Sequence, residues 1–299
     1  MFYVDRNKNP ENPVHPNYRE FGNPFVTSLD ESITDSIVVL ETKSSLLSAY
    51  PNAKKYLWWQ SVDNFFISHM SISKRILKWL GFYPIDIKKE EKNFRRNYPD
   101  VYNDTTIIHL VQSEYARIFL TEAGVPSERI CNLTDYVEDE IVQKSKLVKN
   151  NHRENIVLYN PKKGYRFTKK IIEASSGKDY AFLPLENMTK NEVINNLSKA
   201  KLYIDFGNHP GKDRFPREAA LCGCCIITGR RGAANNDVDI PISSGYKIED
   251  ADKNIPLIVD TIDNVMRNYQ TCYREFDTYR NKILQEKEIF KTEALTIFG

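Results

Sequence analysis

The sequence contains no apolar run near the length of about 20 residues that a helix needs to span a bilayer, and its N-terminus has no apolar signal core. We therefore expect a cytoplasmic protein. Net charge is also low, because 42 Lys and Arg are mixed along the chain with 40 Asp and Glu, giving +2. This balance gives no electrostatic reason to expect a nucleic-acid partner.

Glycine-rich phosphate loops of the common kinds are missing as well. Residues 230–235 read RRGAAN, which contains neither GxGxxG nor a Walker lysine-serine pair. Dinucleotide oxidoreductases and P-loop NTPases therefore lack their main sequence signals here.

The cysteines form no set of CxxC pairs. Three of the five crowd around the end of one predicted helix, where small apolar side chains suit close packing. The nearest histidine is His209, which offers no ligand spacing, so we favour a structural role over a metal site. Their odd number and clustering indicate a reducing compartment. The five are Cys131, Cys222, Cys224, Cys225 and Cys272.

What the sequence does have is a regular alternation of strand and helix patterns. Strands are predicted at residues 37–41, 55–60, 106–112, 129–133, 156–159, 180–185, 201–207 and 224–228. Strands that alternate with helices predict parallel sheets. A short last strand is predicted at 246–248, and residues 255 to about 290 carry a helical apolar stripe.

The length of 299 residues, with 41% hydrophobic and 27% charged residues, is that of a soluble protein with two α/β domains. The polar run 144–155 predicts a linker, so we place the domains at 1–148 and 149–299. The carboxyl ends of the strands should then face a shared cleft, where open α/β sheets bind ligands.

The most informative stretch is residues 205–232. A hydrophobic strand ends on Gly207, a polar loop follows over 208–214, and a small-residue helix is predicted over 217–222 before Gly223 and the next strand. A strand, a polar loop and a helix N-terminus with a charged residue predict a ligand site.

This stretch resembles a motif of the GT-B glycosyltransferases. In many retaining members of that group a loop and helix read Glu-Gly-Phe-Gly-x-Pro-x-x-Glu-Ala, followed by small residues, Gly and a strand; here residues 210–223 read PGKDRFPREAALCG. The resemblance covers roughly residues 155–250 and is closest to bacterial enzymes of surface-polysaccharide synthesis. It implies two Rossmann-like domains facing a cleft, a nucleotide-sugar bound mainly by the second, and C-terminal helices that pack back toward the first.

The resemblance assigns Glu218 to the second glutamate of the motif, which holds the ribose hydroxyls of the nucleotide. A carboxylate accepts two hydroxyl hydrogen bonds and is stabilised by a helix N-terminus. The alternative is a solvated glutamate at the start of a helix. Pro210 stands where the family has its first glutamate, which leaves the donor sugar and the stereochemistry open; His209 and Asp213 are the candidates to replace that contact.

Residues 160–164, NPKKG, resemble the place where the family presents basic residues to the donor diphosphate. Fixed cations stabilise the charge that a diphosphate gains as it leaves. Lys162 or Lys163 would do this, with Lys212 or Arg214 from the other loop; the alternative is an exposed basic turn. The predicted donor-binding residues are Glu218, Lys162, Lys163, Asn208, His209, Gly211, Lys212 and Arg214.

Asp237 and Asp239 form an Asp-x-Asp that resembles the metal-binding motif of single-domain glycosyltransferases. It lies late in the chain, beyond the predicted Glu218 helix, so we favour a loop at the rim of the cleft. We expect neither a metal nor another cofactor, with the nucleotide-sugar as co-substrate.

The first domain is expected to bind the acceptor. Its strand-end residues should lie near the cleft, and they are Trp58, Trp59, Gln60, Ser61, Asp63, His109, Gln112, Ser113, Asp135 and Tyr136. Lys163 and Arg214 are the predicted catalytic cations. If the reaction inverts, Asp63 and His15 are the candidate bases.

Residues 69–83 combine apolar side chains with Lys74, Arg75 and Lys78 at helical spacing. Such a helix either contacts an anionic membrane that carries a lipid-linked acceptor or packs in a core with a solvated basic face.

The sequence thus predicts a metal-independent glycosyltransferase, active on a glycan or lipid-linked glycan in surface-polysaccharide synthesis and possible as a homodimer. Two alternatives stay open: a non-catalytic nucleotide- or sugar-binding subunit of this fold, and a UDP-sugar epimerase.

Overall fold

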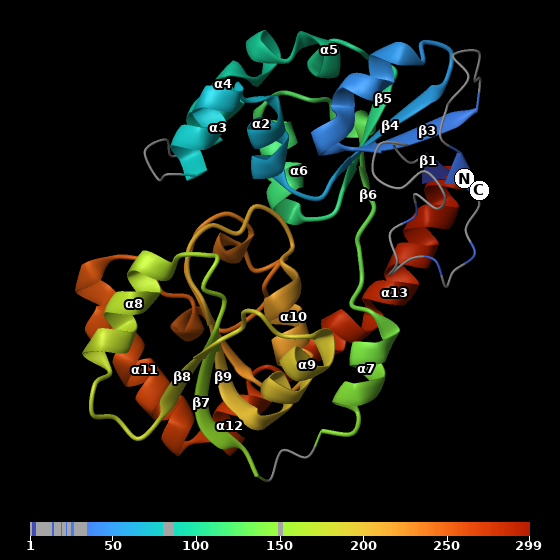
Figure 1. Cartoon of the computed structure of the whole chain (residues 1–299). Coiled ribbons are helices and arrows are strands. Elements are labelled where there is room, and N and C mark those ends of the chain that lie inside the picture. The colour runs from blue at the N-terminus through green and yellow to red at the C-terminus, as the bar shows by residue number, and fades with distance from the viewer. Residues whose placement is uncertain are drawn as a thin grey trace.

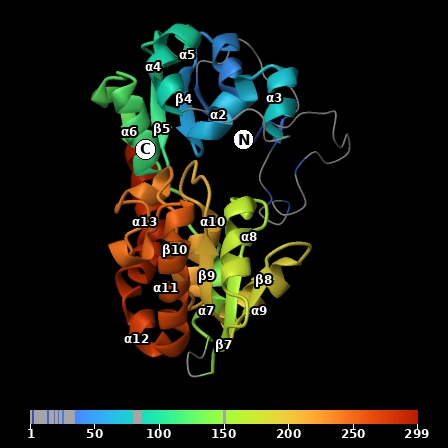
Figure 2. The same ribbon diagram turned by 90° about the vertical axis from the view of Figure 1, so that its left-hand side faces the viewer.

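The computed structural model describes residues 2–3, 14, 19, 22, 25–26, 35–79, 87–148 and 152–299. These residues form an α/β protein with two parallel four-stranded sheets, stacked along the long axis of the molecule in both ribbon views (Figures 1 and 2). The two-residue strands β1 (Phe2–Tyr3) and β2 (Phe25–Val26) form a separate pair. The candidate base His15 lies outside the described residues.

The first sheet has the order β3-β4-β5-β6, which is the order in the chain. Its strands are β3 (Ser36–Leu40), β4 (Lys54–Trp59), β5 (Ile107–Val111) and β6 (Ile130–Asn132). The helices of this half are η2 (Glu41–Ala49), α2 (Val62–His69), α3 (Ile72–Trp79), α4 (Ile87–Asn97), α5 (Pro99–Tyr102), α6 (Glu114–Glu122) and η3 (Ser127–Arg129). An aromatic cluster fills the space between sheet and helices; Trp59, Phe65, Phe94 and Phe119 in it are fully buried.

The second sheet has the order β10-β9-β7-β8. Its strands are β7 (Glu154–Tyr159), β8 (Ala181–Pro184), β9 (Ala200–Asp205) and β10 (Cys225–Thr228). After β8 the chain returns to the other side of β7, so the strand order reverses between β7 and β9. In open α/β sheets, such a reversal is where ligands bind, outside the carboxyl ends of the strands.

Helices cover both faces of the second sheet, as a buried parallel sheet requires. On one face lie α8 (Tyr165–Ala174) and α11 (Ile255–Arg267), and on the other α7 (Asp139–Ser145), α9 (Lys190–Lys199) and α10 (Arg214–Leu221) (Figure 1). Thr189 caps α9 in a capping box with Glu192. The remaining elements are η4 (Ala233–Asn235), η5 (Ser244–Tyr246), η6 (Asp252–Asn254), α12 (Tyr269–Arg274) and α13 (Asp277–Phe298).

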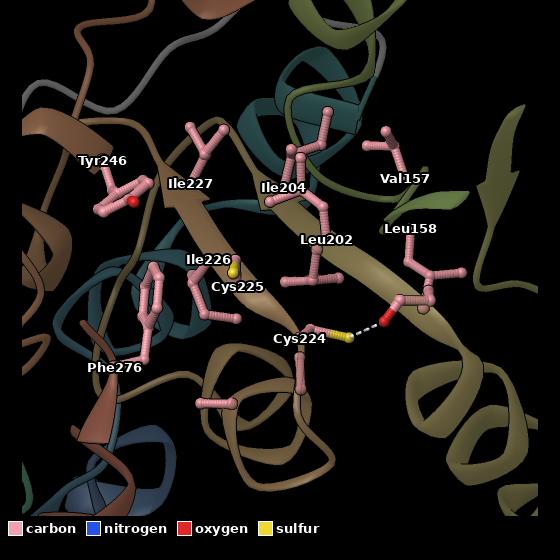
Figure 3. Packing of buried hydrophobic residues seen from close by; sticks show 14 of the residues in the cluster. Val157, Leu158, Leu202, Ile204, Cys224, Cys225, Ile226, Ile227, Tyr246 and Phe276 are labelled. Carbon is pink, nitrogen blue, oxygen red and sulfur yellow. Dashed lines mark hydrogen bonds between the residues drawn. The ribbon is translucent and has the colours of Figure 1, made fainter. Parts of the chain in front are cut away.

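The core of this sheet contains the clustered cysteines (Figure 3). All five cysteines are free. Cys131 is partly buried, and the other four are buried. The Cys224 thiol donates to the carbonyl of Leu197 at 3.2 Å, and burial raises the pKa of that thiol to about 12. The burial of Cys222, Cys224, Cys225 and Cys272 in this core supports a structural role for them.

The last helix, α13, runs from the second sheet up to the first along one side of the molecule (Figure 1). Its Phe290, Ala294 and Ile297 pack on the first sheet, where they meet the buried side chains of Tyr56, Leu110 and Leu133. The Glu293 carboxylate also accepts the backbone N–H of Thr134 at 2.7 Å. Of the C-terminal helices predicted to return toward the first half, α13 does so, whereas α11 and α12 pack in the core of the second sheet.

Two local predictions are wrong. Residues 246–248 form no strand: Tyr246 is the last residue of η5, and a single bridge joins Lys247 to Thr228. The helix predicted to begin at Arg217 begins at Arg214, with Pro216 inside its first turn. The division into domains at 148 and 149 stays a prediction, but Val137 and Ile141, which precede it, belong to the second core.

Candidate functional site

The loops that follow β7 and β9 meet at the point where the strand order reverses. Two glycines in the left-handed region make this possible: Gly164 has φ +60° and Gly207 has φ +99°. A Cβ built on Gly164 would lie 2.2 Å from the carbonyl oxygen of Phe206, so only glycine fits there. Residues 160–164, which include Lys162 and Lys163, are therefore in close contact with the loop 206–213. The sequence predicted this contact, because the carboxyl ends of parallel strands meet at one edge of a sheet.

Lys163 lies at the centre of this junction. Its ammonium contacts Asp205 Oδ1 at 3.0 Å, Asp213 Oδ2 at 2.5 Å and His209 Nδ1 at 3.0 Å. The side chain is 15% exposed, against 3% for Asp205 and 25% for Asp213. Lys163 is thus a partly accessible cation between two carboxylates at the carboxyl edge of the second sheet.

His209 is fully buried, and both of its ring nitrogens have partners. Nδ1 lies 2.8 Å from Asp213 Oδ2 as well as 3.0 Å from Lys163 Nζ, and Nε2 lies 3.2 Å from the carbonyl oxygen of Asp205. Burial acts to raise the pKa of Asp213, but the hydrogen bond from His209 and the charge of Lys163 outweigh it, and the pKa is lowered.

In the described part of the chain, Asp205, His209 and Asp213 also form a group of the kind that holds a metal ion, with ligand atoms within 4.8 Å of one another. The Lys163 ammonium contacts all three of them. A cation supplied by the chain itself therefore already lies where a metal would bind.

Glu218 lies in the second turn of α10 and is 2% exposed. It pairs through Oε1 with Arg214 Nε at 2.7 Å, and burial raises its pKa, assisted by the nearby Glu138. The solvated alternative is excluded by this burial. The prediction that the helix N-terminus stabilises the Glu218 carboxylate is also wrong. The helix starts at Arg214, and the favourable effect of a helix N-terminus on a negative charge fades beyond the first turn.

The other predicted cations differ in their accessibility. The Arg214 side chain is 61% exposed, and Lys162 is also exposed beside an Asn160 turn. Lys212 is buried instead: its ammonium pairs with Glu286 Oε1 at 2.7 Å and donates to Thr134 Oγ1 at 2.8 Å. Lys162 and Lys163 belong to the junction, Arg214 pairs instead with Glu138 beside α7 and with Glu218, and Lys212 binds α13 and the first half.

The loop after β9 also packs directly on the first half of the chain. Asn208 Nδ2 donates to Asp63 Oδ2, and the carbonyl of Pro210 accepts the backbone N–H of Val62 at 2.9 Å. A Cβ on Gly211 would lie 2.0 Å from the carbonyl oxygen of Gln60. Pro210, which replaces the family's first glutamate, thus serves as a backbone contact between the two halves.

Both aspartates of the Asp-x-Asp motif bond to other residues of the protein. Asp237 pairs with Lys247 at 2.7 Å. Asp239 accepts the backbone N–H groups of Glu114 at 2.8 Å and Tyr115 at 2.9 Å, the first two residues of α6 in the other half. This loop lies at the rim between the halves, as the sequence predicted.

Two residues expected near the cleft are instead in the first core. His109 and Trp59 are fully buried, and Trp59 Nε1 donates to His109 Nδ1 at 3.0 Å. Burial lowers the pKa of His109 to about 3, with the Arg129 charge adding to the effect. His109 is the third residue of β5, so it lies inside the strand where the strand-end rule does not apply.

A buried charge network between the halves was not predicted. Arg217, 1% exposed, donates to Glu286 on α13 at 2.9 Å and to Asp135 after β6 at 2.8 Å. The apolar residues between β9 and β10 marked a helix, but no local pattern indicated its partners. The one sequence signal was that Arg217 stands at a helical position whose spacing predicts burial.

The basic segment 69–83 contains α3, whose described side chains face solvent. Ile72 is 74% exposed and Ile76 is 52% exposed, and their i, i+4 spacing places them on one face. Residues 80–83 lie outside the described ranges. No helix in the described part of the chain is long and apolar enough to cross a membrane.

No protein-family model matches the sequence, and no curated protein matches it. Solved structures do match. HepE of Anabaena, in a crystal with UDP and glucose, is 11% identical with a TM-score of 0.52, and the match covers 85% of this chain and 79% of HepE. TarM is 15% identical with a TM-score of 0.56, covering 88% of this chain and 54% of TarM.

Sucrose-phosphate synthase from Thermosynechococcus elongatus is a third match, 12% identical with a TM-score of 0.52, covering 87% of this chain and 71% of that enzyme. These structures are GT-B glycosyltransferases. At such low identity the likeness concerns the fold, and the fold of this chain is that of the GT-B glycosyltransferases.

Proposed function

We propose that this chain is a cytoplasmic, metal-independent glycosyltransferase that moves a sugar from a nucleoside-diphosphate sugar to a glycan or lipid-linked glycan acceptor in surface-polysaccharide synthesis. One observation carries the proposal: the reversal between β7 and β9 brings the Lys163 loop against the loop that leads to Glu218. The matches to HepE in complex with UDP and UDP-glucose support the choice of donor class.

The proposed roles follow from exposure and charge. Lys163 and Arg214, with Lys162 beside them, stabilise the diphosphate as it leaves, since fixed cations at a developing charge need no reorganisation. Glu218 accepts hydrogen bonds from the ribose hydroxyls once Arg214 turns to the diphosphate. Asn208, His209, Gly211 and Lys212 shape the donor loop. The contacts of Lys163 with Asp205, His209 and Asp213, the three potential metal ligands, support a reaction without a metal ion.

Asp63 is the proposed base for an inverting reaction. It follows β4, is 8% exposed, and accepts a hydrogen bond from Asn208 in the donor loop. A base must reach the acceptor hydroxyl in the complex. Asp63→Asn should therefore lower kcat with little change in the affinity for UDP, whereas a retaining reaction should tolerate it.

Calorimetric titration with UDP, GDP and their sugars tests the donor site. We expect one nucleotide to bind, and Glu218→Ala to weaken it at least tenfold, about 1.4 kcal/mol. Absence of binding for every nucleotide would refute the proposal. Unchanged affinity in the Glu218→Ala variant would refute the role of Glu218 alone. An Asp252→Asn variant, on an exposed ion pair with Lys170, is the matched control.

The products separate the rival functions. A transferase releases UDP from UDP-sugar with acceptor and hydrolyses the donor slowly without it. A binding subunit leaves the donor intact, and an epimerase yields a new UDP-sugar in the absence of acceptor. Chromatography of the reaction mixture distinguishes these three outcomes.

Contact with an anionic membrane through α3 is the finer proposal on partners. Exposed Ile72 and Ile76 flank Lys74 and Arg75, the pattern of a helix that lies in the lipid interface. Ile72→Asn with Ile76→Asn should abolish sedimentation with phosphatidylglycerol vesicles, whereas Ile118→Asn, on the 38% exposed Ile118 of α6, should not. Light scattering on the protein without vesicles tests the predicted homodimer.

A further inference from the structure

We propose that a cavity beside the donor loop, residues 206–213, binds a uronic-acid residue of the glycan acceptor through Arg230 and Arg231. The inference rests on the proposed function, because it names the chemical class of the acceptor. Neither arginine belongs to the proposed donor site.

The cavity has a volume of about 630 Å³ and lies between the loop that follows β10 and the loop that follows η5. Both loops lie at the carboxyl end of the second sheet, which faces the first half (Figure 1). Sites for small organic ligands measure about 300–1,000 Å³, so this cavity has room for a sugar ring and not only for an inorganic ion. Its polar lining includes Arg230, Arg231, Asn235, Ser244, Glu249 and Asp250.

Both arginines are held on one side and leave the other side of the guanidinium available. Arg230 Nε donates to the carbonyl oxygen of Lys247 at 2.7 Å, and its Nη2 donates to that of Ser244 at 3.3 Å. Arg231 Nε lies 3.5 Å from Asp250 Oδ2, and the Arg231 side chain is 59% exposed. Within the described ranges, no hydrogen bond engages Nη1 of either arginine. Because a guanidinium binds a carboxylate through two parallel N–H···O bonds, each anchored arginine presents a fork for one.

Two carboxylates on the same wall decide which anion fits. Asp250 is almost fully buried and accepts the backbone N–H of Gly207 at 2.7 Å, whereas Glu249 is exposed and has no ion-pair partner in the described part of the chain. The ammonium of Lys247, which also lines the cavity, pairs with Asp237 at 2.7 Å. The two carboxylates thus balance the two arginines, which favours an anion of single charge over a phosphate ester of about −1.5 to −2. Glu249 also accepts hydrogen bonds from hydroxyls, and a carboxylate beside hydroxyls describes a uronic acid.

The donor loop separates this cavity from Lys163. The Gly207 N–H donates to Asp250 on the cavity side, and a Cβ on Gly207 would lie 2.8 Å from the backbone nitrogen of Gly164, next to Lys163. The donor diphosphate and the ligand of the cavity therefore occupy opposite sides of the loop. The loop after β10 continues to Asp239, which bonds α6 in the first half, where the acceptor is expected. An acceptor of several sugar residues reaches from the first half to the cavity along this loop.

Calorimetric titration of the full chain with trigalacturonate, and with maltotriose as the neutral saccharide, tests the inference. Near neutral pH and in about 0.15 M NaCl, charges farther than about 8 Å are screened. We expect trigalacturonate to bind at least about tenfold more tightly than maltotriose. Equal affinity for the two saccharides, or no binding of trigalacturonate, overturns the inference. Displacement of trigalacturonate by equimolar inorganic phosphate overturns the choice of a uronic acid.

Arg231→Gln is the decisive variant, because Arg231 is exposed and its replacement removes a fork without opening the core. We expect this variant to bind trigalacturonate at least about tenfold more weakly, with unchanged affinity for UDP. Arg231→Lys keeps the charge but not the fork, so it should bind as weakly as Arg231→Gln. Arg267→Gln is the matched control and should change neither affinity, since Arg267 on α11 is 75% exposed and pairs with Asp263 at 3.2 Å.

Full affinity for trigalacturonate in Arg231→Lys overturns recognition by the fork, and equal losses in Arg231→Gln and Arg267→Gln overturn the site. A parallel loss of UDP affinity in Arg231→Gln puts the cavity in the donor site and overturns the acceptor assignment. An Arg231-dependent preference for UDP-galacturonate over UDP-galactose overturns it as well, because the acid then belongs to the donor. Failure of every nucleotide to bind overturns the proposed function instead, and the titration with trigalacturonate does not depend on that result.

Discussion

The Asp239 carboxylate and the backbone N–H of Glu114 form a hydrogen bond of 2.8 Å that joins the two halves of the molecule. Glu114 is the first residue of α6, and the same carboxylate accepts the N–H of Tyr115 while Ser113 accepts that of Ala116. The first three orphan donors of the helix are therefore satisfied, two of them by a residue more than a hundred positions away along the chain.

Asp239→Ala should destabilise the protein by about 1 to 3 kcal/mol, since it leaves two partly buried donors without their acceptor. Urea denaturation followed by circular dichroism measures the change. Asp252→Ala serves as the control, because Asp252 and its ion-pair partner Lys170 are both exposed. Equal losses for the two variants would contradict the interpretation of Asp239 as a link between the halves.

Gly211→Ala should force the β9 loop away from the first half, because the added Cβ would lie 2.0 Å from the carbonyl oxygen of Gln60. We expect a lower urea midpoint and weaker UDP binding together, since the same loop carries the donor residues. Gly245→Ala is the matched control: its Cβ would meet nothing closer than 4.0 Å. A Gly211→Ala protein as stable as the control would show that the contact yields at little cost.

Glu218→Gln should raise the stability of the ligand-free protein while it weakens nucleotide binding. Burial raises the pKa of Glu218, so the charged form is disfavoured in the folded state. The folded protein then binds more protons than the unfolded chain between the unfolded and folded pKa values, and stability falls as pH rises through that window. The gain from the amide should be present at pH 8 and absent near pH 4. Thermal unfolding at both values measures it.

His109 should contribute to acid unfolding. Its folded pKa of about 3 is lower than its ordinary value of 6.5, so the unfolded chain binds the extra proton between these values. Stability from this residue is complete above pH 6.5 and is lost toward pH 3, by about 1.4 kcal/mol per pH unit. Trp59 fluorescence reports the transition, because its indole donates to the ring. His109→Gln should reduce the steepness of the acid transition, while His152→Gln, on an exposed histidine, should not.

The strands were predictable because their signals are local. Each β-rich run between Ile37 and Ile227 carries its own hydrophobic pattern, and all eight predicted runs in the two sheets became strands. The junction of the β7 and β9 loops also followed, since the carboxyl ends of parallel strands meet at one edge. The sequence alone therefore predicts that Lys163 and the polar loop lie close together.

The start of α10 was misjudged for a physical reason. Pro216 suggested that the helix begins after it, yet proline is tolerated throughout a first turn because the N–H it lacks has no helical partner there. The strand predicted around Tyr246 is reduced to a single bridge between Lys247 and Thr228, because Tyr246 itself closes the 3-10 turn η5.

The individual side-chain pairings between distant segments could not be predicted. The Asp239 cap and the pairing of Arg217 with Glu286 join residues whose neighbours in sequence give no sign of each other. The charge of Lys163 suggested a phosphate ligand, but its engagement by Asp205, His209 and Asp213 depends on the fold that brings the two loops after β7 and β9 together.

The packing of α13 on the first sheet also sets an order of events during synthesis. Phe290, Ala294 and Ile297 cover Tyr56, Leu110 and Leu133, so this face of the sheet stays bare until the ribosome has released α13. Domains generally fold as they emerge, and exposed apolar sheet surface favours aggregation. The first half of this chain therefore completes the burial of this face only after α13 has been made.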